Sequence, residues 1–113
     1  MKRYTLMSMM LFLISDVHAA VVESTTIKRL MLDINYGEMV YIELEQRQAT
    51  PIACHTNSGW EYVLDTSTPL GNKMYSMLLA AYAAKSPVKF VGMNNCSLLP
   101  HTSTEGLRRI ELK

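Results

Sequence analysis

Two cysteines, each with a histidine nearby, are the residues of this 113-residue chain best suited to metal or nucleophilic chemistry. His55 directly follows Cys54, and His101 lies five residues after Cys96. Structural zinc sites usually pair their ligands about two to four residues apart, which this spacing does not provide. No third group stands at a recognisable spacing to orient a Cys–His nucleophile. We therefore predict no metal, no cofactor and no catalytic residues.

The same two cysteines fit a disulfide better, because the N-terminus predicts export. It reads MKRYTLMSMMLFLISDVHA, in which Lys2 and Arg3 precede a short apolar run and small residues mark a cleavage site after Ala19. The run is far shorter than the ~20 residues that span a bilayer. We expect a bacterial signal peptide at 1–19, a single domain at 20–113 in the periplasm or outside the cell, and a Cys54–Cys96 bond worth roughly 4 kcal/mol.

The predicted mature chain of 94 residues is formally neutral, with nine basic and nine acidic residues. A nucleic-acid or anionic-membrane partner needs a surplus of basic residues to displace counterions. We therefore predict no nucleic-acid partner and no membrane insertion after signal cleavage.

The elements that must position these groups follow from hydrophobic periodicity. Residues 27–35 alternate with Leu30, Leu32 and Ile34 on one face, and residues 39–45 alternate in the same way, so the two segments predict a hairpin around NYGE. A short strand at 51–56 and a strand at 60–65 predict a second hairpin. Further strands are expected at 88–92 and 107–113, on either side of a long loop at 93–106.

Residues 69–85 predict the single long helix, with Thr68 as its N-cap and Pro87 beyond its end. This order of elements predicts an α+β fold, mainly antiparallel β, as a small OB-like Greek-key barrel with one long helix. The alternative is an open antiparallel sheet with one helix packed across it.

The helix carries two apolar stripes. The stripe expected to pack on the sheet consists of Leu70, Met74, Met77, Leu78 and Ala81. The second consists of Tyr75, Leu79 and Tyr82, and a domain of this size has no second layer to cover it. We predict that the second stripe is an interface between identical chains; the alternative is that the loop at 93–106 covers it.

The segments LDTSTP, MYSMLLAAYAAKSPVKFVG and the following Cys96 resemble a widespread group of short exported bacterial proteins. The order of elements is more distantly similar to the B subunits of pentameric bacterial toxins of the subtilase cytotoxin and typhoid toxin type. That resemblance implies an exported, disulfide-containing homo-oligomer, a pentamer in those toxins, that binds glycans. None of that family's sugar-contacting residues is carried over to this chain.

The turn HTNSGW is the candidate ligand site, because an indole can stack on a sugar while neighbouring polar groups form hydrogen bonds. It comprises His55, Asn57, Ser58 and Trp60. Strand alternation with Tyr62 and Leu64 offers Trp60 a core position instead. We predict an exported, non-enzymatic binding module, similar to a toxin B subunit, that recognises a glycan or cell-surface partner as a homo-oligomer. The alternative is a periplasmic inhibitor or immunity-type factor that binds a protein.

Overall fold

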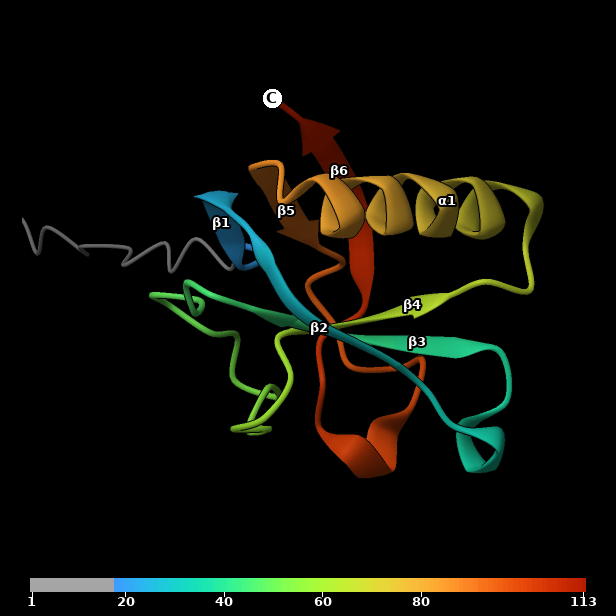
Figure 1. Cartoon of the computed structure of the whole chain (residues 1–113). Coiled ribbons are helices and arrows are strands. Elements are labelled where there is room, and N and C mark those ends of the chain that lie inside the picture. The colour runs from blue at the N-terminus through green and yellow to red at the C-terminus, as the bar shows by residue number, and fades with distance from the viewer. Residues whose placement is uncertain (1–17) are drawn as a thin grey trace, which may run out of the picture.

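Two three-stranded antiparallel sheets and one helix make up the fold in the computed structural model, which describes residues 18–113 (Figure 1). One sheet has the order β1-β5-β6 and the other β2-β3-β4. The predicted α+β, mainly antiparallel class is confirmed; the predicted signal peptide lies almost wholly outside the described residues. In chain order the elements are β1 (Val21–Thr25), β2 (Ile27–Leu32), the 3-10 turn η1 (Ile34–Tyr36), β3 (Met39–Leu44), β4 (Tyr62–Asp65), α1 (Pro69–Ala84), β5 (Val88–Gly92), the 3-10 turn η2 (Pro100–Thr102) and β6 (Leu107–Leu112).

The first predicted hairpin is present as β2 and β3, with Leu30 opposite Ile42. The apolar face predicted for β2 is only partly correct, because Leu32 is 55% exposed and Ile34 is 96% exposed. The strand ends at Leu32, and the Asp33 side chain then accepts a hydrogen bond from the backbone of Asn35, which starts η1 and turns the chain away from the sheet.

The predicted strand at 51–56 does not form. The backbone N–H of His55 donates to the carbonyl of Ile52, so this segment is a turn. The next strand begins only at Tyr62, because the side-chain oxygen of Asn57 accepts hydrogen bonds from the N–H groups of Gly59 and Trp60. These bonds hold the approach to β4 in a loop rather than in the sheet.

The helix α1 begins and ends almost where predicted. The Thr68 hydroxyl accepts from the N–H of Gly71 at 2.9 Å, and Lys85 closes the helix in a left-handed conformation. The stripe predicted to pack on the sheet is partly wrong, since Leu70 is 67% exposed. The buried face is instead Gly71, Met74, Leu78 and Ala81.

Close contact at Gly71 explains this rotation of the buried face. A side chain at Gly71 would collide with the carbonyl oxygen of Asp65 at the end of β4, so only glycine allows the helix to approach there. The first turn therefore faces the sheet with Gly71, and Leu70 points to solvent. The core beneath the helix joins both sheets, and the rings of Tyr62 and Phe90 stack within it at 5.9 Å.

The long loop at 93–106 carries η2 and is tied to the turn at 51–56 by the Cys54–Cys96 disulfide. The predicted disulfide is thus confirmed. In Figure 1, α1 lies on one side of the strands β2, β3 and β4, and η2 lies on the other. Among residues 18–113, no helix is long and apolar enough to cross a membrane.

Candidate functional site

The four residues predicted as a ligand site do not share one pocket. Asn57 and Trp60 line a pocket on the η2 side, whereas His55 lines a neighbouring pocket that Asn57 also borders. Ser58 lines neither of these two pockets, and its carbonyl accepts a hydrogen bond from the Arg47 guanidinium. Ligand binding by these four residues stays a prediction.

Asn57 has all of its amide atoms committed to the fold. Its oxygen caps the turn that precedes Trp60, and its nitrogen donates to the carbonyl of Thr102 at 3.2 Å and to the hydroxyl of Thr104 at 2.9 Å. Backbone N–H groups of Thr56 and Asn57 also donate to the carbonyl of Ser103. Asn57 therefore positions Trp60 against η2.

His55 is likewise built into the framework. Its Nδ1 accepts a hydrogen bond from the backbone N–H of Glu105 at 3.0 Å, which requires that nitrogen to be unprotonated. Burial, and secondarily the charge of Arg47, lower the pKa of His55, so both effects keep the imidazole neutral. This histidine links the turn at 51–56 to the segment that leads into β6.

Two buried carboxylates lie behind these loops. Glu61 is 2% exposed, and it accepts from Arg47 Nε at 2.8 Å and from the Leu44 N–H at 3.2 Å. Glu105 is fully buried, with Oε2 accepting from the Asn94 N–H at 2.9 Å, and burial raises its pKa. These hydrogen bonds and the Arg47–Glu61 ion pair connect the loops to the sheets. Within residues 18–113, no cluster of three His, Cys, Asp or Glu side chains is arranged to hold a metal ion.

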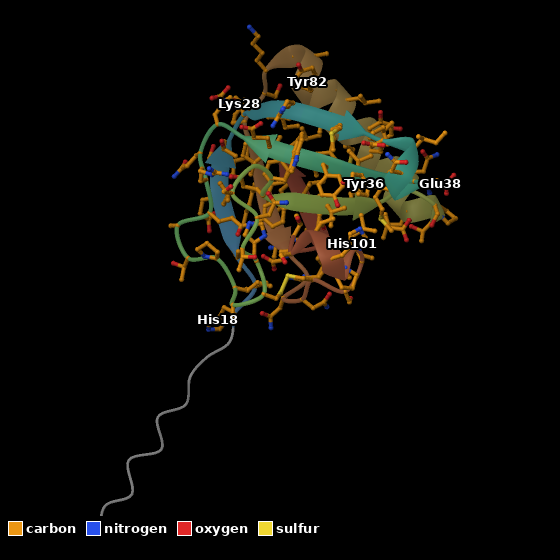
Figure 2. The ribbon with its side chains drawn as sticks, turned by 90° about the horizontal axis from the view of Figure 1, so that it is seen from below. His18, Lys28, Tyr36, Glu38, Tyr82 and His101 are labelled. Atoms are coloured by element: carbon orange, nitrogen blue, oxygen red, sulfur yellow. A yellow bond between two sulfur atoms is a disulfide. The ribbon has the colours of Figure 1, made fainter. Side chains whose placement is uncertain are left out.

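Trp60 takes part in a cluster of four rings that sequence reasoning missed. Tyr41 lies between Trp60 and Tyr36, with ring centroids 5.7 Å and 5.3 Å away, and Tyr36 lies 6.2 Å from His101. Figure 2 shows Tyr36 and His101 close together and well away from Tyr82 on α1. We call the pocket lined by these four rings the aromatic pocket. Its members come from η1, β3, the loop before β4, and η2, so no local pattern in the sequence predicts it.

A second surface lies where α1 crosses β2. Tyr75, Leu79 and Tyr82 line a groove with a volume of about 310 Å³, together with residues 29–32 of β2 and Val40. We call it the α1–β2 groove. Leu79 is 44% exposed and Tyr82 is 46% exposed, so these two residues of the predicted interface stripe are open to solvent in the single chain. Tyr75 is partly buried against the core.

The loop at 93–106 does not cover this groove. Its apolar residues Met93 and Leu98 lie instead beside Leu70 and Gly71, at the start of the helix. The alternative in which the loop buries the second stripe is therefore wrong, and the exposed stripe needs another explanation.

Comparison of the chain with protein-family models, with curated proteins and with solved structures finds no match. The functional argument therefore depends on the geometry of these surfaces.

Proposed function

We propose that this protein is an exported, non-enzymatic binding module that self-associates through the α1–β2 groove and recognises a glycan or cell-surface partner. The observation that carries the proposal is the apolar stripe of Tyr75, Leu79 and Tyr82, of which Leu79 and Tyr82 are exposed and Tyr75 is partly buried against the core. This stripe continues across the groove onto Leu32, which is 55% exposed. A contiguous apolar surface of this kind typically marks an interface.

The composition of α1 favours a second copy of the chain as the occupant. The exposed side of the helix has only three strongly polar residues, Asn72, Lys73 and Lys85, while Ala80 and Ala83 are small enough for another helix to approach closely. Most soluble oligomers are symmetric, and symmetry places the same surface of each subunit in contact. Two copies of the stripe would then bury each other's aromatic and leucine side chains.

We further propose that the two sheets belong to one OB-like barrel. Only Thr26 separates β1 from β2, so one bent segment contributes to both sheets. On the opposite side, Val63 of β4 forms a parallel bridge with Gly106, and its N–H donates to the carbonyl of Glu105 at 3.0 Å. These two links support a Greek-key barrel in which α1 covers one end.

Export is supported by the disulfide and by the N-terminal sequence. Structural disulfides are characteristic of proteins that fold in oxidising compartments such as the bacterial periplasm. Cys54 and Cys96 are bonded to each other.

The test of self-association replaces Leu79 with glutamate and follows the mass by multi-angle light scattering. Burying an unpaired charge at the interface should raise the dissociation constant at least about a hundredfold, or about 2.8 kcal/mol. Leu112→Glu is the matched control, since Leu112 is also 44% exposed but lies on β6, away from the groove. Both variants should keep the wild-type circular dichroism. Equal masses for Leu79→Glu and wild type would contradict the interface.

A further inference from the structure

The aromatic pocket has the geometry of a small-ligand site. Its volume is about 290 Å³, at the lower end of the about 300–1,000 Å³ common for ligand pockets. That space suits one ring rather than an extended molecule. Four rings border it: Tyr36 and Tyr41 come from neighbouring elements, and Trp60 and His101 come from loops farther along the chain.

Several contacts fix these rings before any ligand arrives. The guanidinium of Arg29 lies 4.2 Å from the centre of the Trp60 ring, and Glu43 holds Arg29 through a 2.7 Å contact to its Nε. Asn57 ties the loop of Trp60 to η2. The disulfide joins the same two loops. A site held in this way loses little entropy on binding.

One buried polar group at the pocket is poorly satisfied. Tyr41 is 2% exposed, and its hydroxyl makes no hydrogen bond of standard geometry. Burial raises the pKa of this phenol, and a weaker side-chain hydrogen bond with Thr102 opposes that shift. The Thr102 hydroxyl itself donates to the carbonyl of Leu99 at 2.8 Å. The neutral Tyr41 hydroxyl therefore retains its capacity to bond to a ligand, and an unsatisfied buried hydroxyl is costly without one.

The charges of the side chains around the pocket restrict the class of ligand that it can bind. The side chains that line the pocket include no Asp, Glu, Lys or Arg. An organic cation would compete with Arg29, which already lies against Trp60. A neutral ring with an apolar face and hydroxyl groups fits both the aromatic walls and the buried phenol.

We propose that the aromatic pocket binds one neutral pyranose ring of a glycan. The C–H face of the sugar contacts the ring of Tyr36 and the edge of Trp60, because Arg29 already covers one face of that indole, and a sugar hydroxyl bonds to Tyr41, with His101 at the rim. This inference rests on the proposed function as a binding module and deepens it, because it assigns the ligand class and its site.

The test uses residues 20–113 and the fluorescence of Trp60, which is the only tryptophan in the chain. The protein is titrated to tens of millimolar with the methyl glycosides of glucose, galactose, mannose and N-acetylglucosamine. At least one of them should give a saturable change. No saturation with any glycoside would overturn the inference, as would saturation only with N-acetylneuraminic acid or only with tetramethylammonium.

Variants separate the pocket from the rest of the fold. Tyr36→Ala and Tyr41→Phe should each weaken sugar binding at least about tenfold, or about 1.4 kcal/mol. Leu112→Ala, on β6 and away from both the pocket and the groove, should leave it unchanged. If both pocket variants bind the glycoside as tightly as wild type does, the aromatic pocket is not the binding site. Tyr41→Phe keeps the ring and removes only a poorly bonded hydroxyl, so it should remain folded.

Failure of this inference is distinguishable from failure of the proposed self-association. A wild-type protein that is monomeric yet binds a glycoside contradicts the oligomer and supports the pocket. A wild-type oligomer that binds none of the glycosides contradicts sugar binding by the aromatic pocket and is still consistent with self-association through the α1–β2 groove.

Discussion

The α1–β2 groove and the aromatic pocket are both exposed, yet they are built in different ways. The groove takes its apolar side chains mainly from one helix and one strand. The pocket takes its rings from η1, β3 and two loops, and a disulfide and the amide of Asn57 join those two loops to each other. The two hollows have similar volumes, about 310 and 290 Å³. The groove continues onto exposed apolar side chains of α1 and β2, which suits a protein partner. The pocket is bordered by fixed rings, which suits a small ligand.

The difference also predicts how each surface responds to damage. The groove should persist as long as α1 stays packed on the core. The pocket should be lost whenever the loop at 51–61 and the loop at 93–106 separate, even if the sheets remain intact. Four stability measurements follow, from the largest expected effect to the smallest.

Removing the disulfide should have the largest effect. The double variant Cys54→Ser/Cys96→Ser should lower the free energy of unfolding by about 2 to 5 kcal/mol, because the bond constrains a long loop of the unfolded chain. Thermal unfolding followed by circular dichroism measures this loss. At temperatures where the variant remains folded, it should lose glycoside binding but still self-associate. If the variant instead binds glycosides but no longer self-associates, the groove depends on the disulfide and the pocket does not, which contradicts this comparison.

The two sides of α1 should differ in their tolerance of truncation. Leu78 is fully buried and Leu79 is 44% exposed. Leu78→Ala should cost about 2 to 5 kcal/mol, because it leaves a cavity in the core. In dilute, monomeric protein, Leu79→Ala should cost less than about 0.5 kcal/mol. Urea denaturation measures both, and a similar cost for the two would mean that the Leu79 side is not free in the single chain.

Two tyrosine hydroxyls provide a smaller contrast. The Tyr62 hydroxyl donates to the carbonyl of Ala20 at 2.8 Å in the core. Tyr62→Phe should therefore cost about 1 kcal/mol of stability and leave glycoside binding intact. Tyr41→Phe should leave stability unchanged or raise it slightly, because it removes a poorly satisfied buried hydroxyl, and it should weaken binding. Chemical denaturation of both variants checks the first part; a large loss of stability in Tyr41→Phe would show that its hydroxyl is already satisfied by the fold.

The smallest expected effect is a change in how steeply the free energy of unfolding depends on pH. Burial raises the pKa of Glu105, so the folded chain retains a proton at pH values where the unfolded chain has lost it. The free energy of unfolding should fall as pH rises from the unfolded pKa to the folded pKa, and the full penalty is present above both. Glu105→Gln removes this titrating group and therefore its contribution to the pH dependence of stability. Urea denaturation from about pH 4 to pH 7 should show that the free energy of unfolding falls less steeply with pH in the variant than in wild type. Parallel curves for the two proteins would contradict this role for Glu105.

Local patterns in the sequence predicted much of the fold. The alternation of Val40, Ile42 and Leu44 and the cap at Thr68 each depend on neighbours in the chain, and the structure confirms the β3 strand and the start of α1. The disulfide followed from the cysteine count and the exported context. The apolar stripe of Tyr75, Leu79 and Tyr82 could be identified for the same reason, because helical spacing places these residues on one side.

The parts that the sequence did not predict depend on long-range contacts. The buried face of α1 is set by the close approach of Gly71 to Asp65, which periodicity does not reveal. The position of Trp60 depends on hydrogen bonds from Asn57 to residues 102 and 104, more than forty positions away. His101 joins the aromatic pocket only because η2 folds back beside η1.

The most direct test of the account is the mass of wild-type protein in solution. Light scattering of residues 20–113, with the disulfide intact, should give at least twice the chain mass at tens of micromolar, and that mass should decrease on dilution if exchange is rapid. A wild-type protein that has the mass of one chain throughout this range would contradict self-association through the α1–β2 groove.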